Sequence, residues 1–175
     1  MKCAIIGVGN TLFNDDGVGV YTALYLKENY TFSPNLDIYD GGTLGLNLIE
    51  YLQAYDQVII LDTLSLNAQA GEVFRVPAEE FFGLGDQRST AHEVEVIQML
   101  EAGILHGVKA NVVVLGIIPE DINTVSIGLS NSMEIHFEKY LDVVLDEIVC
   151  LGIKATRTST VSLESVVKSL MGSYN

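Results

Sequence analysis

The sequence predicts an α/β domain in which a mostly parallel sheet carries helices on both faces. Short apolar runs, typical of buried strands, alternate along most of the chain with longer segments of helical spacing. Glycine and aspartate follow several of the apolar runs, as expected where a strand passes into a loop. The chain has 175 residues, of which 49% are hydrophobic, so it is long enough to bury a core without disulfides.

Apolar runs predict four strands, at residues 2–8, 36–39, 58–61 and 111–118. Residues 71–76 predict a fifth strand, and its connection from Asp62 is too short for a crossover helix. We therefore expect this strand to pair antiparallel at an edge of the sheet. Helical spacing predicts helices at residues 18–30, 44–55, 94–104 and 130–152, the third of them preceded by the capping-box spacing of Thr90 and Glu93.

The charge of the chain argues against nucleic-acid binding. Acidic residues number 23 and basic residues 9, for a net charge of −14, which repels phosphate backbones. No run approaches the ~18 consecutive apolar residues of a membrane span, and the first residues lack the apolar core of a signal peptide. We expect a cytoplasmic protein without membrane insertion. Cys3 and Cys150 predict no disulfide framework, and both are expected to be buried packing residues.

The C-terminal residues form a compositional unit of their own. Residues 154–175 hold three basic residues and one acidic residue, although the rest of the chain is strongly acidic. The Ser/Thr-rich stretch 155–162 predicts a linker between a domain at 1–153 and a short amphipathic helix, with apolar residues at Leu163, Val166, Val167, Leu170 and Met171. A chain truncated after Lys154 is expected to stay folded.

Three residues fall where open α/β sheets place their sites, beyond the carboxyl ends of the strands. Asp16 opens the first helix, Asp62 ends the central apolar strand, and His92 lies in the first turn of a helix. Two carboxylates and an imidazole suit a divalent metal, and the helix dipole favours the neutral imidazole that a metal requires. Simpler alternatives remain: Asp15 or Asp16 caps the helix, Asp62 bonds a turn, and His92 is solvated.

Two other classes of site fit the sequence poorly. The run from Gly7 to Leu12 resembles a dinucleotide-binding loop, but Leu12 replaces the third glycine and Asp15 and Asp16 put charges where a pyrophosphate would lie. The chain also lacks the Gly-x-Ser-x-Gly elbow of serine hydrolases.

Five segments, in order, carry a resemblance to a known family. They are Gly7-Val8-Gly9-Asn10 with Asp15-Asp16-Gly17-Val18-Gly19, Asp40-Gly41-Gly42-Thr43-Leu44-Gly45-Leu46, Ile60-Leu61-Asp62, the region around His92, and Gly116-Ile117-Ile118-Pro119-Glu120 with Gly128-Leu129-Ser130. Over residues 2–152 the chain resembles the hydrogenase maturation endopeptidases, which trim the C-terminus of the large subunit of nickel–iron hydrogenases.

The resemblance implies a single three-layer domain with a twisted five-stranded sheet. It also implies that Asp16, Asp62 and His92 are the metal-contacting residues, although many family members have Glu at the position of Asp16. Nickel would belong to the substrate, the large-subunit precursor, and no tightly bound organic cofactor is expected. The alternative function is a chaperone that holds nickel or the precursor without cutting it.

Overall fold

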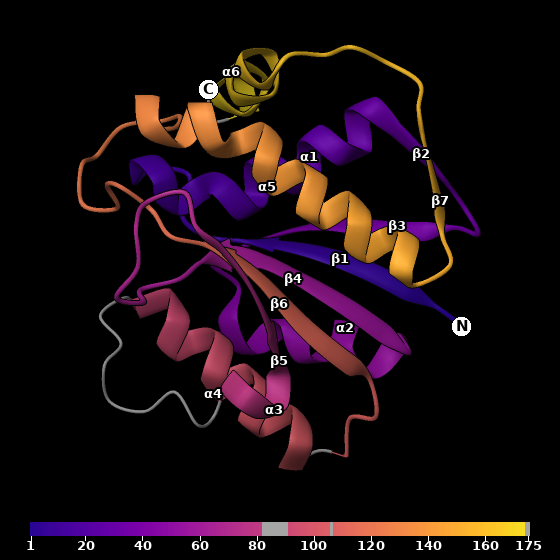
Figure 1. Cartoon of the computed structure of the whole chain (residues 1–175). Coiled ribbons are helices and arrows are strands. Elements are labelled where there is room, and N and C mark those ends of the chain that lie inside the picture. The colour runs from indigo at the N-terminus through magenta and orange to yellow at the C-terminus, as the bar shows by residue number, and fades with distance from the viewer. Residues whose placement is uncertain (82–90, 106, 174–175) are drawn as a thin grey trace.

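The computed structural model describes residues 1–81, 91–105 and 107–173, and a five-stranded sheet runs through its centre (Figure 1). The strands lie in the order β3-β1-β4-β6-β5. Their bounds are Cys3–Val8 for β1, Leu36–Gly42 for β3, Gln57–Thr63 for β4, Val73–Pro77 for β5 and Asn111–Ile117 for β6. All neighbours pair parallel except β5, which is antiparallel to β6 at the edge. The α/β class and the antiparallel edge strand are therefore confirmed.

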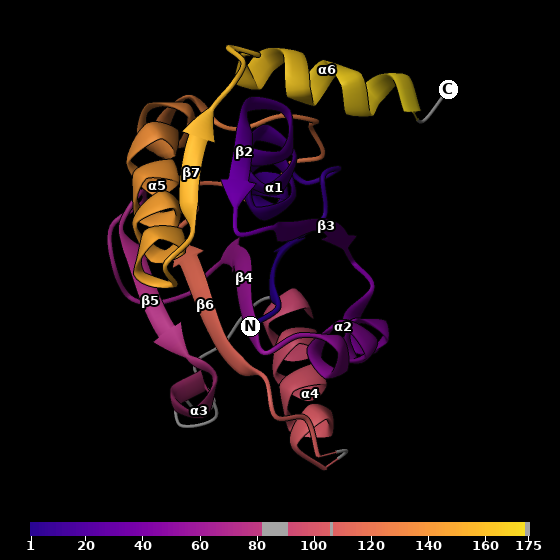
Figure 2. The ribbon, with the colours of Figure 1, turned by 90° about the vertical axis from the view of Figure 1, so that its right-hand side faces the viewer.

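Helices cover both faces of this sheet, giving three layers (Figures 1 and 2). On one face lie α1 (Val18–Asn29) and α5 (Asn131–Cys150), and α6 (Leu163–Ser173) packs against α1 on the side away from the sheet (Figure 2). On the other lie α2, α3 and α4, with bounds Ile49–Ala54, Ala78–Phe81 and Ala91–Leu105. Two apolar clusters form the core, one on each face of the sheet. β1, β4 and β6 supply side chains to both clusters, which explains their uninterrupted apolar sequences.

Helix α1 approaches the sheet unusually closely because glycines stand at the crossing. A Cβ at Gly19 of α1 would overlap the backbone carbonyl oxygens of Val8 and Leu61, and a Cβ at Gly7 would overlap the carbonyl oxygen of Gly19. Only residues without a side chain allow this approach. It fixes the start of α1, and the turn before it, against the carboxyl ends of β1 and β4.

The C-terminal residues depart from the expected linker. Residues Lys154–Arg157 form strand β7, which pairs antiparallel with β2 (Tyr30–Ser33) in a second, two-stranded sheet. The buried side chain of Asn29 then holds the following segment, donating to the carbonyl of Val161 at 3.1 Å and accepting from its N–H at 2.8 Å. The predicted amphipathic helix is α6, and its Val166 is buried in the core cluster that includes α1 and α5.

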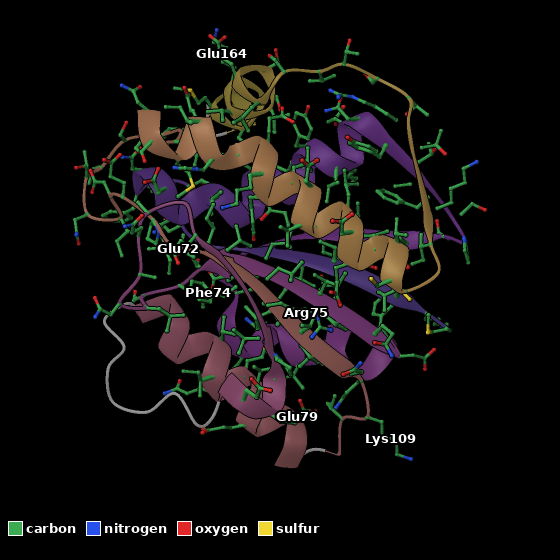
Figure 3. The ribbon with its side chains drawn as sticks, viewed as in Figure 1. Glu72, Phe74, Arg75, Glu79, Lys109 and Glu164 are labelled. Atoms are coloured by element: carbon green, nitrogen blue, oxygen red, sulfur yellow. The ribbon has the colours of Figure 1, made fainter. Side chains whose placement is uncertain are left out.

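Helix α5 is tied to the far edge of the sheet by an ion pair. Arg75 of β5, labelled in Figure 3, donates from Nε and Nη2 to the two carboxylate oxygens of Glu147, at 2.7 and 2.9 Å. A bidentate pair of this kind fixes orientation as well as distance.

The two cysteines differ in their surroundings. Cys3 is buried in β1, as predicted, and burial raises the pKa of its thiol. Cys150, at the end of α5, is exposed, so the expectation that it is a packing residue is wrong. The helical pattern around Cys150 is apolar enough to suggest burial, but Ile148 takes the buried position in the last turn of α5, and Val149 and Cys150 are exposed.

Within the described residues, no helix has both the length and the apolar composition needed to cross a membrane.

Deletion of residues 155–175 should leave a folded but less stable domain. The deletion removes most of β7, the bonds between Asn29 and Val161, and the burial of Val166. We expect the free energy of unfolding to fall by about 2–4 kcal/mol and Tm by about 5–15 °C. Thermal unfolding followed by circular dichroism measures this, with deletion of residues 172–175 as the control. An unchanged Tm would show that the tail contributes nothing to the body.

Candidate active site

The topology places one crevice at the carboxyl edge of the sheet. The chain passes from β1 through α1 to β3 on one side, and then through α2 to β4 on the other side of β1. α1 and α2 cover opposite faces, so the carboxyl ends of β1 and β4 form a topological switch point (Figure 1). Ligands of open α/β sheets bind at such points.

Asp62 lies at the carboxyl end of β4, directly at the switch point. Its side chain is 1% exposed, and its Oδ1 accepts the backbone N–H of Thr63 at 2.8 Å. The phenol of Tyr140 of α5 lies in the same interior region and donates to the carbonyl of Leu115 at 2.7 Å. Burial, together with the negative charge of Asp62, raises the pKa of Tyr140 well above its usual range. Tyr140 therefore stays a neutral donor beneath the carboxylate.

Asp16 lies in the short 3-10 turn Asn14–Gly17 that leads into α1, and its side chain is 4% exposed. Its Oδ2 accepts the backbone N–H of Asn10 at 2.9 Å, which folds the loop after β1 back onto the turn. Its Oδ1 accepts the hydroxyl of Thr63 at 3.4 Å. Thr63 thus contacts both Asp16 and Asp62, and the structure brings these two predicted residues together.

The alternative role for this acidic pair, capping of α1, is wrong. The N-cap residue of α1 is Gly17, and no side chain makes a capping hydrogen bond there. Asp16 bonds to the loop after β1 and to Thr63 of β4, and Asp15 bonds to the loop after β6.

Asp15 has a structural role that the sequence analysis missed. Its carboxylate is fully buried and accepts the backbone N–H groups of Glu120, Asp121 and Ser130 at 3.0, 3.0 and 2.6 Å. It also accepts the hydroxyl of Ser130 at 2.9 Å, and that hydroxyl accepts the N–H of Met133 to cap α5. Asp15 therefore joins the turn after β1 to the loop after β6. The sequence signal that could have indicated this role is the pair of adjacent acidic residues, Asp15 and Asp16, after a predicted buried strand.

His92 is the second residue of α4, so the predicted helix is present at that position. α4 leads back to the start of β6 through a short connection, so it begins at the carboxyl edge, where Asp16 and Asp62 lie (Figure 1). The His92 side chain and the capping residue Thr90 lie outside what the structure describes. Among the described side chains, no group of three or more His, Cys, Asp and Glu forms a metal cluster, so the three-ligand set stays a prediction.

The site is therefore built on a doubly wound α/β domain with buried carboxylates at its switch point. The sequence of the chain matches a family model described as hydrogenase maturation protease over residues 20–147. The Hydrogenase 2 maturation protease of Escherichia coli (strain K12) is 29% identical over 157 residues, which span 89% of this chain and 95% of that protein. The hydrogenase expression/formation protein HoxM of Cupriavidus necator is 32% identical over 120 residues, 67% of this chain and 59% of that protein.

Solved structures agree with these matches. The hydrogenase maturating endopeptidase HybD from E. coli superposes with a TM-score of 0.81 at 28% identity, covering 90% of this chain and 98% of that one. The hydrogenase maturation protease HybD from Thermococcus kodakarensis shares the fold, with a TM-score of 0.69 at 23% identity, covering 84% of this chain and 99% of that one. The chain belongs to the hydrogenase maturation proteases, and the predicted single domain with a five-stranded sheet is confirmed.

Replacement of Asp15 by asparagine should destabilise the protein. The amide would present an N–H₂ group to the donors that now meet a carboxylate, in a position without access to water. We expect the free energy of unfolding to fall by about 3 kcal/mol and Tm by about 6–12 °C. Asp142→Asn, at an exposed position of α5, is the control and should leave Tm unchanged within about 1 °C. Equal melting temperatures for the two variants would contradict the joining role of Asp15.

Proposed function

We propose that this chain is the endopeptidase that removes a C-terminal peptide from the large-subunit precursor of a nickel–iron hydrogenase, and that it uses the nickel of that precursor for recognition. Membership of the protease family supports the reaction class. The single structural observation that supports the site is the pair of buried carboxylates, Asp16 and Asp62, both bonded to Thr63 at the switch point.

The donor set argues that nickel comes with the substrate. Asp16, Asp62 and His92 supply two carboxylates and one imidazole, whereas nickel favours nitrogen and sulfur donors. The free protein should therefore hold nickel weakly. A precursor whose own thiolates already hold the ion would complete the coordination, and the carboxylates would supply the remaining contacts. An acidic site also favours a metal-bearing precursor over an empty one by charge complementarity.

Cleavage then needs no serine or cysteine nucleophile. A metal ion beside the scissile bond polarises its carbonyl or lowers the pKa of an attacking water. A carboxylate within reach of that water can accept its proton. Thr63 holds Asp16 through its hydroxyl and Asp62 through its backbone N–H, so both carboxylates keep fixed orientations while the substrate changes.

Removal of either of two site groups should abolish processing. We expect Asp62→Asn and His92→Ala each to lower the rate of precursor cleavage by at least about a hundredfold, because each removes a metal contact. Mass spectrometry of a matching large-subunit precursor before and after incubation measures cleavage, and circular dichroism checks the fold. The double variant Cys3→Ala, Cys150→Ala is the control and should keep the wild-type rate.

Three outcomes would count against this assignment. Near-normal cleavage by a folded Asp62→Asn or His92→Ala variant would remove that residue from the site. Loss of cleavage in a folded double cysteine variant would point to a thiol mechanism. Tight binding of the precursor without any cleavage by the wild-type protein would favour the chaperone alternative.

Cleavage should depend on nickel bound to the precursor and not on nickel bound to the protease. We expect the purified protein to contain little nickel and to cleave a nickel-loaded precursor without added metal. A nickel-free precursor should stay uncut, because the bridging ion is missing. Elemental analysis of both proteins, with cleavage measured in metal-free buffer, tests this. Efficient cleavage of a precursor shown to lack nickel would contradict the bridging role.

A further inference from the structure

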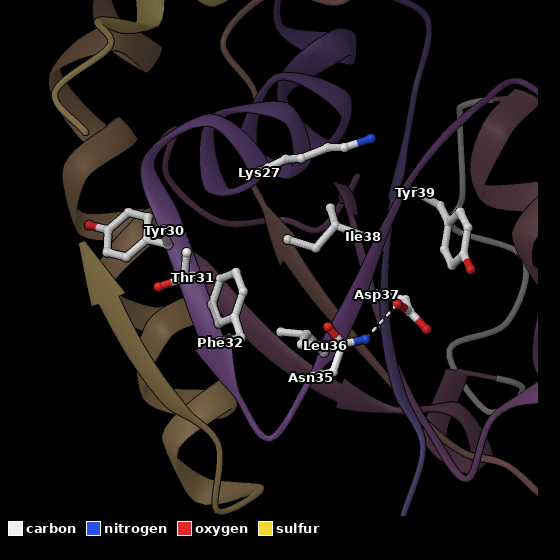
Figure 4. A pocket seen from close by; sticks show the side chains of 9 residues that line it. All are labelled: Lys27, Tyr30, Thr31, Phe32, Asn35, Leu36, Asp37, Ile38 and Tyr39. Atoms are coloured by element: carbon white, nitrogen blue, oxygen red, sulfur yellow. Dashed lines mark hydrogen bonds between the residues drawn. The ribbon is translucent and has the colours of Figure 1, made fainter. Parts of the chain in front are cut away.

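Two hollows take part of their lining from helix α1 and part from the edge strand β3. The first has a volume of about 550 Å³ and is lined by Lys27 of α1, by Phe32 of β2 and by Ile38 of β3, among others (Figure 4). The second, of about 270 Å³, includes Val20 of α1 and Asp40 of β3 in its lining. Both hollows therefore take walls from the same helix and the same strand.

The spacing of these residues shows that the hollows follow one line. Leu36, Ile38 and Asp40 alternate along β3, so their side chains share one face of the strand, the face toward α1. Val20 and Lys27 are about two turns apart on α1 and share one face of the helix. Burial raises the pKa of Asp40, and the backbone N–H of Gly42 and the charge of Lys27 each offset part of that effect. We call this line from Leu36 to Asp40 the β3 track.

The backbone beside the track is open to pairing. β3 is the end strand of the sheet, and within the described residues it pairs only with β1. An edge strand presents a row of N–H and C=O groups that an extended peptide can pair with. The other edge strand, β5, runs antiparallel to β6, and its Arg75 is held by the carboxylate of Glu147 of α5.

The track leads to the candidate site. At its carboxyl end, the carbonyl of Gly42 accepts the N–H of Gly9 at 3.0 Å, which joins β3 to the loop after β1. Asn10, in that loop, lines the second hollow and donates its N–H to Asp16. A chain laid along β3 would therefore reach the loop whose Asn10 N–H is bonded to the Asp16 carboxylate.

We propose that the β3 track binds an extended segment of the hydrogenase precursor, which adds to the sheet as a strand beside β3 and is guided by it to the carboxylates. This inference rests on the proposed function. Backbone hydrogen bonds to β3 would contribute binding affinity that does not depend on the amino-acid sequence of the bound segment. Alternate side chains of an extended segment are about 7 Å apart and would point toward the hollows. The walls at Phe32 and Ile38 favour an apolar side chain in the first hollow.

The kinetics of precursor cleavage distinguish binding along the β3 track, which affects KM, from the chemical step, which affects kcat. Ile38→Glu puts a charge into the first hollow, and we expect it to raise KM for the precursor about tenfold while kcat changes less than about twofold. The matched control, Val149→Glu, alters a 58% exposed residue near the end of α5 and should leave both constants unchanged. Lys27→Glu, at an exposed position on the other wall, is a second variant that does not disturb the core, and it should raise KM at least about threefold.

Amide hydrogen exchange gives an independent readout of the same binding. With Asp62→Asn protein and intact precursor, we expect slower exchange in Leu36–Gly42 and unchanged exchange in β5. Wild-type KM values for both track variants, or unchanged exchange along β3 in the bound complex, would overturn the proposal. Protection of β3 that grows with protein concentration in the absence of precursor would also overturn it, in favour of pairing with a second copy. If the wild-type protein cut no precursor but β3 were protected, the proposed function would fail and the track would stand.

Discussion

The site depends first on the buried carboxylate of Asp15. A charge buried at this depth is tolerated only when hydrogen bonds replace its water, and the backbone of the loop after β6 provides them. The same bonds fix the short turn before α1, and so they fix the neighbouring Asp16. Asp15 thus joins two loops that are more than a hundred residues apart in the chain. The turn held in this way directs the Asp16 side chain toward Thr63 of β4.

The close contact of α1 with the sheet is the second requirement. Without side chains at Gly7 and Gly19, the helix reaches the carbonyl groups of β1 and β4, and the turn in front of it lies over the switch point. Asp62, at the end of β4, then shares Thr63 with Asp16. Carboxylates gathered at one edge of an acidic chain repel one another, and an approaching cation relieves this repulsion, as the proposed recognition of a nickel-loaded precursor requires.

The two edges of the sheet are treated differently. β5 runs antiparallel and carries Arg75, whose ion pair with Glu147 ties it to α5 (Figure 3). Within the part of the chain that the structure describes, β3 pairs with β1 alone, and β2 forms the opposite wall of the hollow beside it (Figures 2 and 4). Exposed edges carry a risk of aggregation, so an edge left open beside a functional site indicates a use for it.

The sequence by itself determined the alternation of strands and helices, the antiparallel edge strand at Val73–Pro77, and the placement of Asp16 before the first helix and of Asp62 at the end of the central strand. These features follow from local periodicity and from the rule that α/β sites lie at carboxyl ends. Only the tertiary structure decided that β7 pairs with β2, that Cys150 is exposed, and that Asp15 bonds a distant loop instead of capping α1. Each of these features depends on contacts between segments far apart in the chain. A local pattern of apolar and polar residues does not show which distant backbone groups a given side chain will contact.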